Sequence, residues 1–217
     1  QVVARLGSVA RDAGAAGVAL LPRWFYEQAQ PDMEEWFVAA ADASRLPLWI
    51  YNFPERTGNR VERNTVRSVC ERVTVGGLKQ SGANQEFIRE LAPLARELEF
   101  SVFAGADARI PESLELGASG CIGGLANVLP EAMVKVFNAT RSGNTALAAN
   151  ELRLLREVDQ RMHLVPFPYN VAAVMEARGI PAGVLPPTMS RVTRAHYEQL
   201  KKETGAMLRD HGLMPPW

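Results

Sequence analysis

The sequence is poor in histidine and cysteine, and it has no excess of charge of either sign. Its 217 residues contain three histidines and two cysteines, and 24 basic residues balance 24 acidic ones. Two cysteines without a Cys-x-x-Cys or Cys/His cluster do not indicate a metal site, so Cys70 and Cys121 are interpreted as reduced core thiols. A neutral chain gives no electrostatic reason to expect nucleic acid or an acidic membrane surface as a partner.

Long hydrophobic runs are also missing. A membrane-spanning helix needs about 20 consecutive apolar residues, and no run approaches that length. The first residues lack the layout of a signal peptide. We therefore expect a cytoplasmic protein that acts on a small molecule, with no membrane partner. The hydrophobic content of 47% is enough for a substantial core.

Apolar runs alternate with helical periodicity through the first two thirds of the chain. Short continuous apolar runs predict strands at residues 18–21, 46–52, 75–80, 100–105 and 119–124. Amphipathic stretches predict helices at residues 2–13, 32–44, 62–73, 84–97, 108–117, 130–141, 144–161, 168–178 and 190–210. Continuous apolar strands are typical of a parallel sheet covered on both faces, so the pattern predicts a series of βα units.

A series of βα units is compatible with an open doubly wound sheet or with part of a (β/α)8 barrel. The Gly-x-Gly-x-x-Gly motif that a dinucleotide-binding sheet carries after its first strand is missing. In a barrel, catalytic groups gather where the strands end. The predicted strands end at or just before Tyr51, Lys79, residues 105–107 and Asn127, and this distribution favours a barrel.

Lys79 is one of only four lysines, and it alone ends a predicted strand. The other three, Lys135, Lys201 and Lys202, lie in amphipathic surroundings typical of helices. Partial desolvation at a strand end favours the neutral amine, which attacks carbonyl groups and forms Schiff bases. The alternative is a structural lysine whose stem is buried and whose ammonium group reaches water.

Tyr51 ends the preceding predicted strand. Adjacent parallel strands lie about 4.8 Å apart, so side chains at the same end of both can meet one small substrate. Imine formation requires protons to move on and off the carbinolamine oxygen, and a neighbouring phenol is suited to that task. The alternative is an aromatic side chain that merely caps the sheet edge.

Two motifs resemble the dihydrodipicolinate synthase/N-acetylneuraminate lyase family of class I aldolases. The first is Tyr-Asn-Phe-Pro-Glu-Arg-Thr-Gly over residues 51–58, and the second is Gly-Leu-Lys-Gln-Ser, which places Lys79 28 positions after Tyr51. The resemblance continues through residues 103–107, 117–122, 125–130 and 166–168. It therefore covers nearly the whole chain.

The resemblance implies a (β/α)8 TIM barrel with a C-terminal helical extension. Residues 1–142 would supply five βα units of the barrel, and residues 143–217 would form the extension. It also implies a homotetramer, built as a dimer of dimers, and a reaction that requires no metal or organic cofactor. Because eight strands close such a barrel, we expect roughly three further βα units upstream of the given sequence.

The resemblance also implies roles for particular residues. Lys79 would condense with pyruvate or another 2-oxo acid, including sugar acids, and Tyr51 would shuttle protons at the imine and the substrate hydroxyl. Gly105 and Ile122 would line the keto-acid pocket through backbone groups. Arg56 would bind the carboxylate of a second substrate, although a solvated loop arginine is the alternative.

The sequence departs from the family pattern in two places. It has no Gly-Thr-Thr-Gly-Glu-type loop, whose hydroxyls and amides bind the keto-acid carboxylate. Phe25 stands where the synthase branch has a tyrosine that crosses a dimer interface to join the neighbour's proton relay, and Tyr26 follows one position later. The missing hydroxyl weakens the case for a lysine-biosynthetic synthase and leaves a sugar-acid lyase or dehydratase open.

The second substrate and the direction of reaction also remain open at this point. Aldol cleavage, condensation and dehydration all pass through the enamine that a Schiff base makes accessible. Two alternatives from other classes are a non-catalytic family member that binds a 2-oxo acid, and a structural piece of a split protein. The presence of both Lys79 and Tyr51 favours the enzyme.

Overall fold

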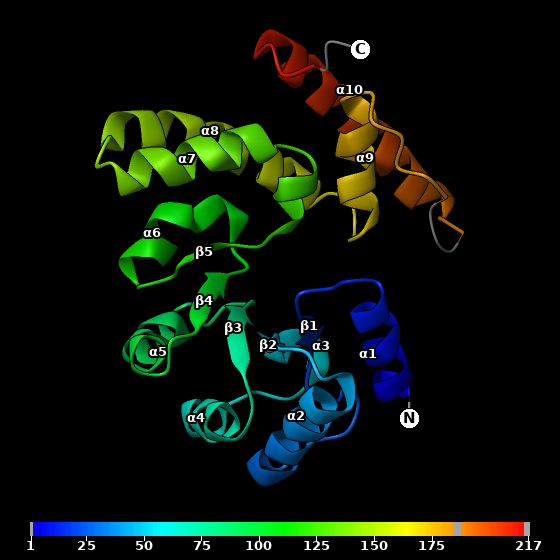
Figure 1. Ribbon diagram of the computed structural model, residues 1–217. Coiled ribbons are helices and arrows are strands. Elements are labelled where there is room, and N and C mark those ends of the chain that lie inside the picture. The colour runs from blue at the N-terminus through cyan, green and yellow to red at the C-terminus, as the bar shows by residue number, and fades with distance from the viewer. Residues whose placement is uncertain (1, 185–187, 215–217) are drawn as a thin grey trace. The chain divides into compact units, whose positions relative to one another are not determined.

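Five parallel strands lie side by side in one sheet, in the order in which they occur along the chain (Figure 1). The computed structural model describes residues 2–184 and 188–214. The strands are β1 Val18–Leu20, β2 Leu48–Asn52, β3 Val75–Gln80, β4 Ser101–Ala104 and β5 Gly120–Cys121. A doubly wound sheet would reverse direction partway, whereas this unreversed order is that of a barrel wall.

One face of the sheet carries the core of the first compact unit. This unit comprises residues 1–106 and 112–122. Leu48 and Ile50 of β2 and Leu78 of β3 are fully buried, and they share a cluster with Phe37 and Phe87 from two covering helices. Because side chains alternate along a strand, the residues between these positions point to the opposite face. That opposite face holds the candidate site.

The covering helices begin and end where local chemistry predicts. The described helices of this unit are α1 Val2–Asp12, α2 Gln30–Ser44, the short α3 Pro54–Thr57, α4 Arg63–Arg72, α5 Glu86–Glu97 and α6 Ile110–Glu115, whose first two residues belong to the second unit. Pro31 occupies the first turn of α2, where no intrahelical N–H is needed, and Arg45 ends the helix with a left-handed φ of 55°. α1 packs closely on α2 because Gly7 has no side chain: a Cβ there would lie 2.6 Å from the Cβ of Ser44.

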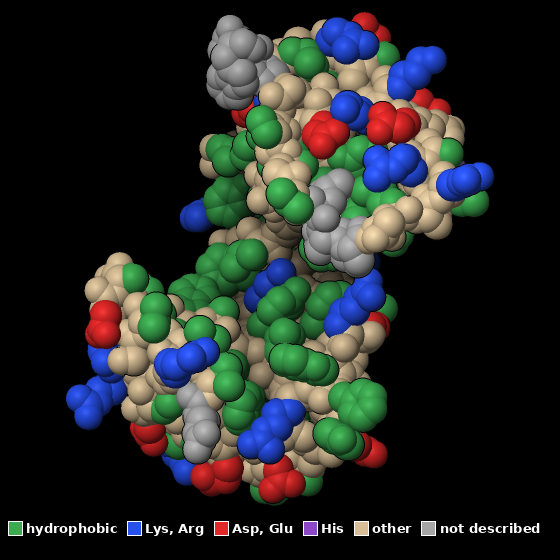
Figure 2. Space-filling model, turned by 90° about the vertical axis from the view of Figure 1, so that its right-hand side faces the viewer, with side chains coloured by type: hydrophobic (Ala, Val, Ile, Leu, Met, Phe, Trp, Pro, Cys, Tyr) green, Lys and Arg blue, Asp and Glu red, His purple; other side chains and the backbone are tan. Residues whose placement is uncertain are grey.

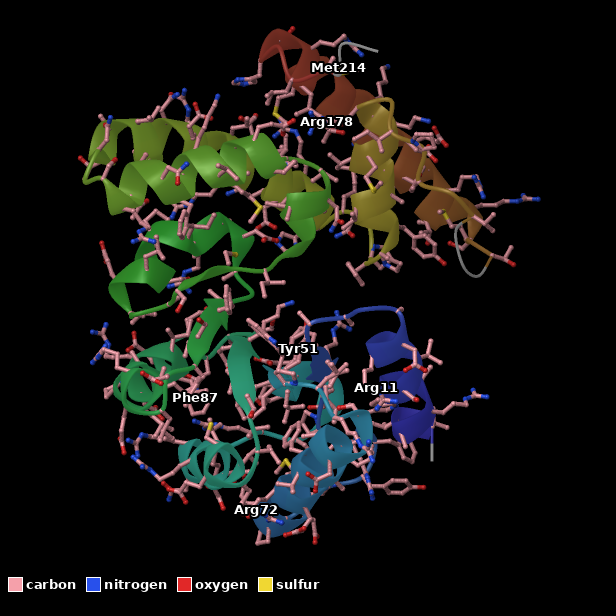
Figure 3. The ribbon with its side chains drawn as sticks, viewed as in Figure 1. Arg11, Tyr51, Arg72, Phe87, Arg178 and Met214 are labelled. Carbon is pink, nitrogen blue, oxygen red and sulfur yellow. The ribbon has the colours of Figure 1, made fainter. Side chains whose placement is uncertain are left out.

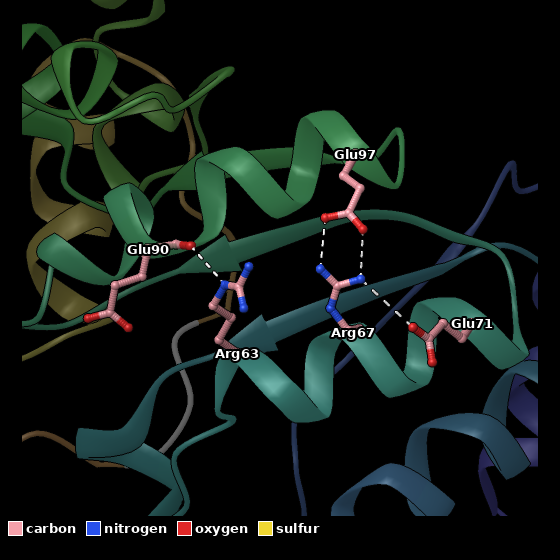
Figure 4. A network of polar contacts seen from close by, with 5 residues as sticks. All are labelled: Arg63, Arg67, Glu71, Glu90 and Glu97. Carbon is pink, nitrogen blue, oxygen red and sulfur yellow. Dashed lines mark hydrogen bonds and ion pairs between the residues drawn. The ribbon is translucent and has the colours of Figure 1, made fainter.

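Arginine side chains of α4 connect this helix to α5 on the outer surface (Figure 4). Arg67 donates two hydrogen bonds to the Glu97 carboxylate, at 2.8 and 2.7 Å, and it lies 3.8 Å from Glu71. Arg63 donates to the backbone oxygen of Glu90. Exposed ion pairs contribute little to stability, so the buried apolar cluster holds these helices in place.

The second compact unit is almost entirely helical and comprises residues 107–111 and 123–217. Its elements are the short 3₁₀ helices η1 Asp107–Arg109 and η2 Gly124–Asn127 and the helices α7 Pro130–Arg141, α8 Thr145–Met162, α9 Tyr169–Ala177 and α10 Arg191–Asp210. Asn144 and Ser190 accept hydrogen bonds from backbone N–H groups at the starts of α8 and α10.

Arg178 is the buried polar centre of this second unit (Figure 3). Its guanidinium pairs with Glu131 at 2.8 Å and also donates to the carbonyl groups of Val128 and Leu213. The Arg178 side chain is only 7% exposed. The hydrogen bonds to these partners therefore replace those to the water that the guanidinium loses on burial.

Among the described residues, the predicted strands are confirmed in number and order, but several boundaries of strands and helices were wrong by one or more residues. The strand predicted at 119–124 contains only Gly120 and Cys121, because η2 begins at Gly124 and the Asp107 carboxylate accepts a hydrogen bond from the N–H of Leu125. The helix predicted at 108–117 divides into η1 and α6. The strand predicted at 100–105 ends at Ala104.

A short helix, α3 Pro54–Thr57, was not predicted. Pro54 fits its first turn, and Gly58 ends it with a φ of 76°. The sequence also predicts that residues 1–142 form barrel units and residues 143–217 form a C-terminal extension. This division remains a prediction. Among the helices of residues 2–184 and 188–214, none is long and apolar enough to cross a membrane.

Candidate active site

The register of β2 and β3 places Tyr51 directly beside Lys79. The two residues are Cα partners across the parallel pair. The Lys79 Nζ atom donates a hydrogen bond to the Tyr51 Oη atom at 3.1 Å and lies 4.2 Å from the centre of the phenol ring. Both side chains are half-buried, and Figure 3 labels Tyr51 on β2. The predicted juxtaposition of amine and phenol is therefore confirmed.

Aromatic rings occupy the same face next to this pair. Phe103 on β4 is the register partner of Lys79 on the side away from Tyr51. Trp49 lies two residues before Tyr51, and its ring centre is 5.5 Å from that of Phe103. Gly77 makes room for the indole, since a Cβ there would lie 2.4 Å from the Trp49 ring. The Lys79 amine thus lies beside an apolar surface that Trp49 and Phe103 form on this face of the sheet.

Gly105 borders the lysine stem. A Cβ at this position would lie 3.2 Å from the Lys79 Cε atom and 2.0 Å from the Ser81 Oγ atom. The Gly105 N–H donates to the carbonyl of Gln80 at 2.7 Å, which fixes the turn after β4 against the end of β3. A glycine is required here by close approach of neighbouring side chains rather than by its own backbone angles.

Ile122 follows β5 and belongs to the same unit. Its side chain is 43% exposed, and its N–H donates to the carbonyl of Ala104 at 2.9 Å. The N–H groups of both predicted keto-acid-lining residues, Gly105 and Ile122, are therefore engaged in the sheet. A ligand that contacts the backbone of Gly105 or Ile122 would therefore meet a carbonyl group rather than a free N–H. The role of these two residues in binding remains a prediction.

Arg56 lies on α3, within the turn that follows Tyr51. Its guanidinium is exposed and 6.0 Å from the centre of the Phe53 ring, and Phe53 stacks with Tyr51 at 6.0 Å. The neighbouring Glu55 carboxylate accepts a hydrogen bond from the N–H of Ala83 at 2.7 Å. This contact ties the turn after β2 to the turn after β3 and sets where Arg56 can reach.

Phe25 projects from the loop that follows β1. Its side chain is 84% exposed and its φ is 81°, an uncommon conformation for a bulky residue. Its ring meets Tyr26 edge to face at 4.9 Å. The structure does not place Phe25 against Lys79 or Tyr51. Trp24 and Tyr26 of the same loop are also exposed, and Figure 2 shows further hydrophobic side chains at the molecular surface.

Asn59 holds the loop after β1 that carries Phe25 and Tyr26, and only its place after Thr-Gly in the sequence could have pointed to it. The side chain is 3% exposed, and its Nδ2 atom donates to the carbonyls of Arg23 and Tyr26 at 2.7 and 2.8 Å. Its Oδ1 atom accepts from the N–H of Gln28. Because Asn59 closely follows α3, it links the loop that carries Phe25 to the turn after Tyr51.

The buried pair Asn52 and Gln80 was also missed as a functional feature. Their side-chain amides join at 2.8 Å directly behind Tyr51 and Lys79. Asp107 and Asn127, which the sequence placed with the other strand-end residues, belong to the second unit. There, Asp107 fixes the start of η2, and the Asn127 side chain donates to the Gly124 carbonyl.

The sequence matches the model of the dihydrodipicolinate synthetase family over residues 3–207. The chain belongs to this family. Its members are class I aldolase-type lyases and synthases that form Schiff bases, and solved structures of the family share its (β/α)8 barrel fold. The resemblance drawn from the two motifs and the predicted fold class are thereby confirmed.

Relatives and solved structures extend this match. The chain is 29% identical to a 4-hydroxy-tetrahydrodipicolinate synthase of Methanoculleus marisnigri over 96% of its own length and 70% of the relative. Identity to the synthase of Limosilactobacillus fermentum is 32%, over 78% of the chain and 54% of the relative. YagE, a prophage protein of E. coli K12 solved in complex with pyruvate, superposes with a TM-score of 0.82 at 25% identity, covering 97% of this chain and 71% of that one. The chain thus spans about half to seven tenths of these relatives.

Proposed function

We propose that this family member forms a Schiff base between Lys79 and pyruvate or a related 2-oxo acid. The observation that carries the proposal is the 3.1 Å hydrogen bond between the Lys79 amine and the Tyr51 hydroxyl. Both groups lie on the sheet face opposite the helix-covered core. The pyruvate held by the structural neighbour YagE gives the class of ligand independent support.

The geometry suits each step of imine chemistry. The neutral Lys79 amine attacks the keto carbon, and the proton it loses passes to the developing carbinolamine oxygen through Tyr51. A second protonation of that oxygen releases water and leaves the protonated imine. The imine nitrogen then draws electrons from the neighbouring carbon, so a carbanion becomes an enamine. Aldol cleavage, aldol condensation and loss of a β-hydroxyl group all proceed from this enamine.

Substrate contacts follow from the positions around the pair. Gly105 leaves space beside the Lys79 stem, and the carbonyl of Ile122 would border the keto acid at the next strand end. Arg56 would bind the carboxylate of a second substrate, because its exposed guanidinium lies along the ring series that Phe53 and Tyr51 form. The aldehyde or sugar-acid partner would be selected by this arginine.

Phe25 would contact substrate from a second copy of the chain within a homotetramer. Phe25 is exposed, and Asn59 holds the loop that carries it through hydrogen bonds to the carbonyls of Arg23 and Tyr26. This supports that part of the proposal, since a projecting ring on a loop held in place is suited to enter a neighbouring subunit. A phenylalanine there supplies no hydroxyl. The proton relay would therefore rest on Tyr51 rather than on a tyrosine from the partner, which favours a lyase or dehydratase over a lysine-biosynthetic synthase.

Borohydride trapping tests the proposal. Incubation with pyruvate and borohydride followed by peptide mapping should place a stable adduct on Lys79. The Lys79→Arg variant should form none, because a guanidinium does not form this imine. Lys202→Arg, which removes an exposed lysine of α10, should leave trapping unchanged.

The same experiment separates the enzyme from a non-catalytic 2-oxo-acid-binding protein. Pyruvate binding measured by calorimetry without any adduct on Lys79 would overturn the Schiff-base proposal and favour the binding protein. A panel of 2-oxo sugar acids, together with aspartate semialdehyde plus pyruvate, then identifies the second substrate.

A further inference from the structure

Two buried side-chain amides stand directly behind the reactive pair. Asn52 follows Tyr51 and Gln80 follows Lys79, and each is only 1% exposed. Because successive side chains alternate across a strand, both amides point to the covered face of the sheet while the amine and phenol point to the open face. We infer that Asn52 and Gln80 are positioning residues that hold the Lys79 amine against the Tyr51 hydroxyl.

The hydrogen bonds of the two amides connect the ends of β2 and β3 with the segment that follows α3. Asn52 Nδ2 donates to Gln80 Oε1 at 2.8 Å, and Asn52 Oδ1 accepts from the N–H of Val61 at 3.0 Å. Gln80 Nε2 donates to the carbonyl of Ser81 at 2.9 Å. The backbone adds a second link between β2 and β3, because the Ser81 N–H donates to the Asn52 carbonyl, and the Gly105 N–H donates to the Gln80 carbonyl from the turn after β4.

This arrangement fixes the relation of the two strands more firmly than backbone pairing alone. The β2–β3 register shifts between Leu48 and Trp49 and is continuous from there to the pair of Asn52 and Gln80, so contacts at the carboxyl end help to hold Tyr51 opposite Lys79. The side-chain link between Asn52 and Gln80 is such a contact, one residue beyond the reactive pair. A misplacement of about 1 Å between reacting groups is enough to slow a reaction about 100-fold.

The inference rests on the proposed function, and two substitutions at Gln80 test it. Gln80→Met keeps the length of the side chain and removes both hydrogen bonds. Gln80→Glu keeps the acceptor for Asn52, but its second oxygen faces the Ser81 carbonyl and is accommodated only as the protonated acid. Burial favours that neutral form, and deprotonation as the pH rises sets an oxygen anion against a carbonyl oxygen.

Gln85→Met is the matched control. Gln85 is also a buried glutamine, 5% exposed, in the turn after β3, and its amide donates to the Gly82 carbonyl. It has no hydrogen bond to β2 among those that the structure records. A general loss of stability from removing a buried amide should appear in this control as well, whereas a positioning effect should be confined to Gln80.

The measurement is the borohydride-trapping rate with pyruvate, normalised to the unsubstituted chain at each pH between about 6 and 9, on protein shown to be folded by circular dichroism. We expect Gln80→Met to be slower by about tenfold or more at every pH. Gln80→Glu should approach the unsubstituted rate at the acidic end and fall toward Gln80→Met at the basic end. Gln85→Met should remain within about twofold. Folded Gln80→Met with a rate within about twofold, or a flat profile for Gln80→Glu, overturns the inference.

Failure of the proposed function gives a different result. If the unsubstituted chain forms no adduct, crystal structures of that chain and of Gln80→Met decide the positioning role. The separation between Lys79 Nζ and Tyr51 Oη, 3.1 Å in the unsubstituted chain, should exceed hydrogen-bond distance in the variant. An unchanged separation refutes the role whether or not the chain is an enzyme.

Discussion

Gly105→Ala should slow imine formation while causing only a moderate loss of stability. The added Cβ would lie 2.0 Å from Ser81 Oγ and 3.2 Å from Lys79 Cε, whereas ordinary contact begins near 3.4 Å. The Ser81 hydroxyl must therefore move by about 1.4 Å and the lysine stem by a few tenths of an ångström, since non-bonded atoms repel steeply below contact distance. Ser81 is 4% exposed, so its displacement disturbs a packed region.

Overpacking of this kind lowers the free energy of unfolding by about 1–3 kcal/mol. Displacement of the Lys79 stem should slow adduct formation by about tenfold, because the amine leaves its aligned position beside Tyr51. Chemical denaturation measures the first quantity and borohydride trapping with pyruvate measures the second, each on the purified full chain.

A matched glycine provides the control for this substitution. Gly124→Ala adds a Cβ whose nearest neighbour is 3.6 Å away, so its trapping rate should stay within about twofold of the unsubstituted chain. The double variant Gly105→Ala/Ser81→Ala removes the closest contact but keeps the one to Lys79. It should recover stability more than trapping rate. A Gly105→Ala protein that traps pyruvate at the unsubstituted rate would refute the reasoning.

Two further predictions concern ionisation. The Arg178 guanidinium holds the pKa of the Glu131 carboxyl below its ordinary value. At pH values above the pKa of Glu131 in the unfolded chain, the ion pair therefore stabilises the second unit. This stabilisation is lost as the pH falls through the lower pKa of Glu131 in the folded chain. The stability difference between the unsubstituted chain and Glu131→Gln should therefore shrink between about pH 7 and pH 3 in denaturation experiments, and a constant difference would contradict the pairing. Burial raises the pKa of the Cys70 thiol to about 11. Its alkylation by iodoacetamide should therefore be slow at pH 7 and accelerate up to about pH 11, as measured by peptide mapping. Rapid alkylation at neutral pH in folded protein would contradict this prediction.

Local sequence chemistry determined the order of elements and the location of the site. β3 was predicted at 75–80 and spans Val75–Gln80, because a continuous apolar run between polar neighbours has few other ways to be buried. The juxtaposition of Tyr51 and Lys79 also followed from the chain alone, since residues that end consecutive parallel strands share one edge of the sheet.

Other features depended on residues that only folding brings together. Nothing local in the sequence distinguishes Asn52 and Gln80 from ordinary polar strand ends. Their role arises because the sheet buries both amides and sets them 2.8 Å apart. The start of η2 likewise depends on Asp107, which lies 18 positions before Leu125 and accepts a hydrogen bond from its N–H.

From the sequence alone we predicted which groups would carry the chemistry, because reactive side chains of a barrel lie at the strand ends. Only the tertiary structure decided how those groups are held. In the sequence, Gly105 resembles an ordinary turn glycine, and only the structure shows that Ser81 and Lys79 pack against it. Asn59 likewise resembles an ordinary loop residue, and only the structure shows that its amide donates to the carbonyls of Arg23 and Tyr26. Such contacts join distant parts of the chain, so their partners are specified by packing and not by spacing.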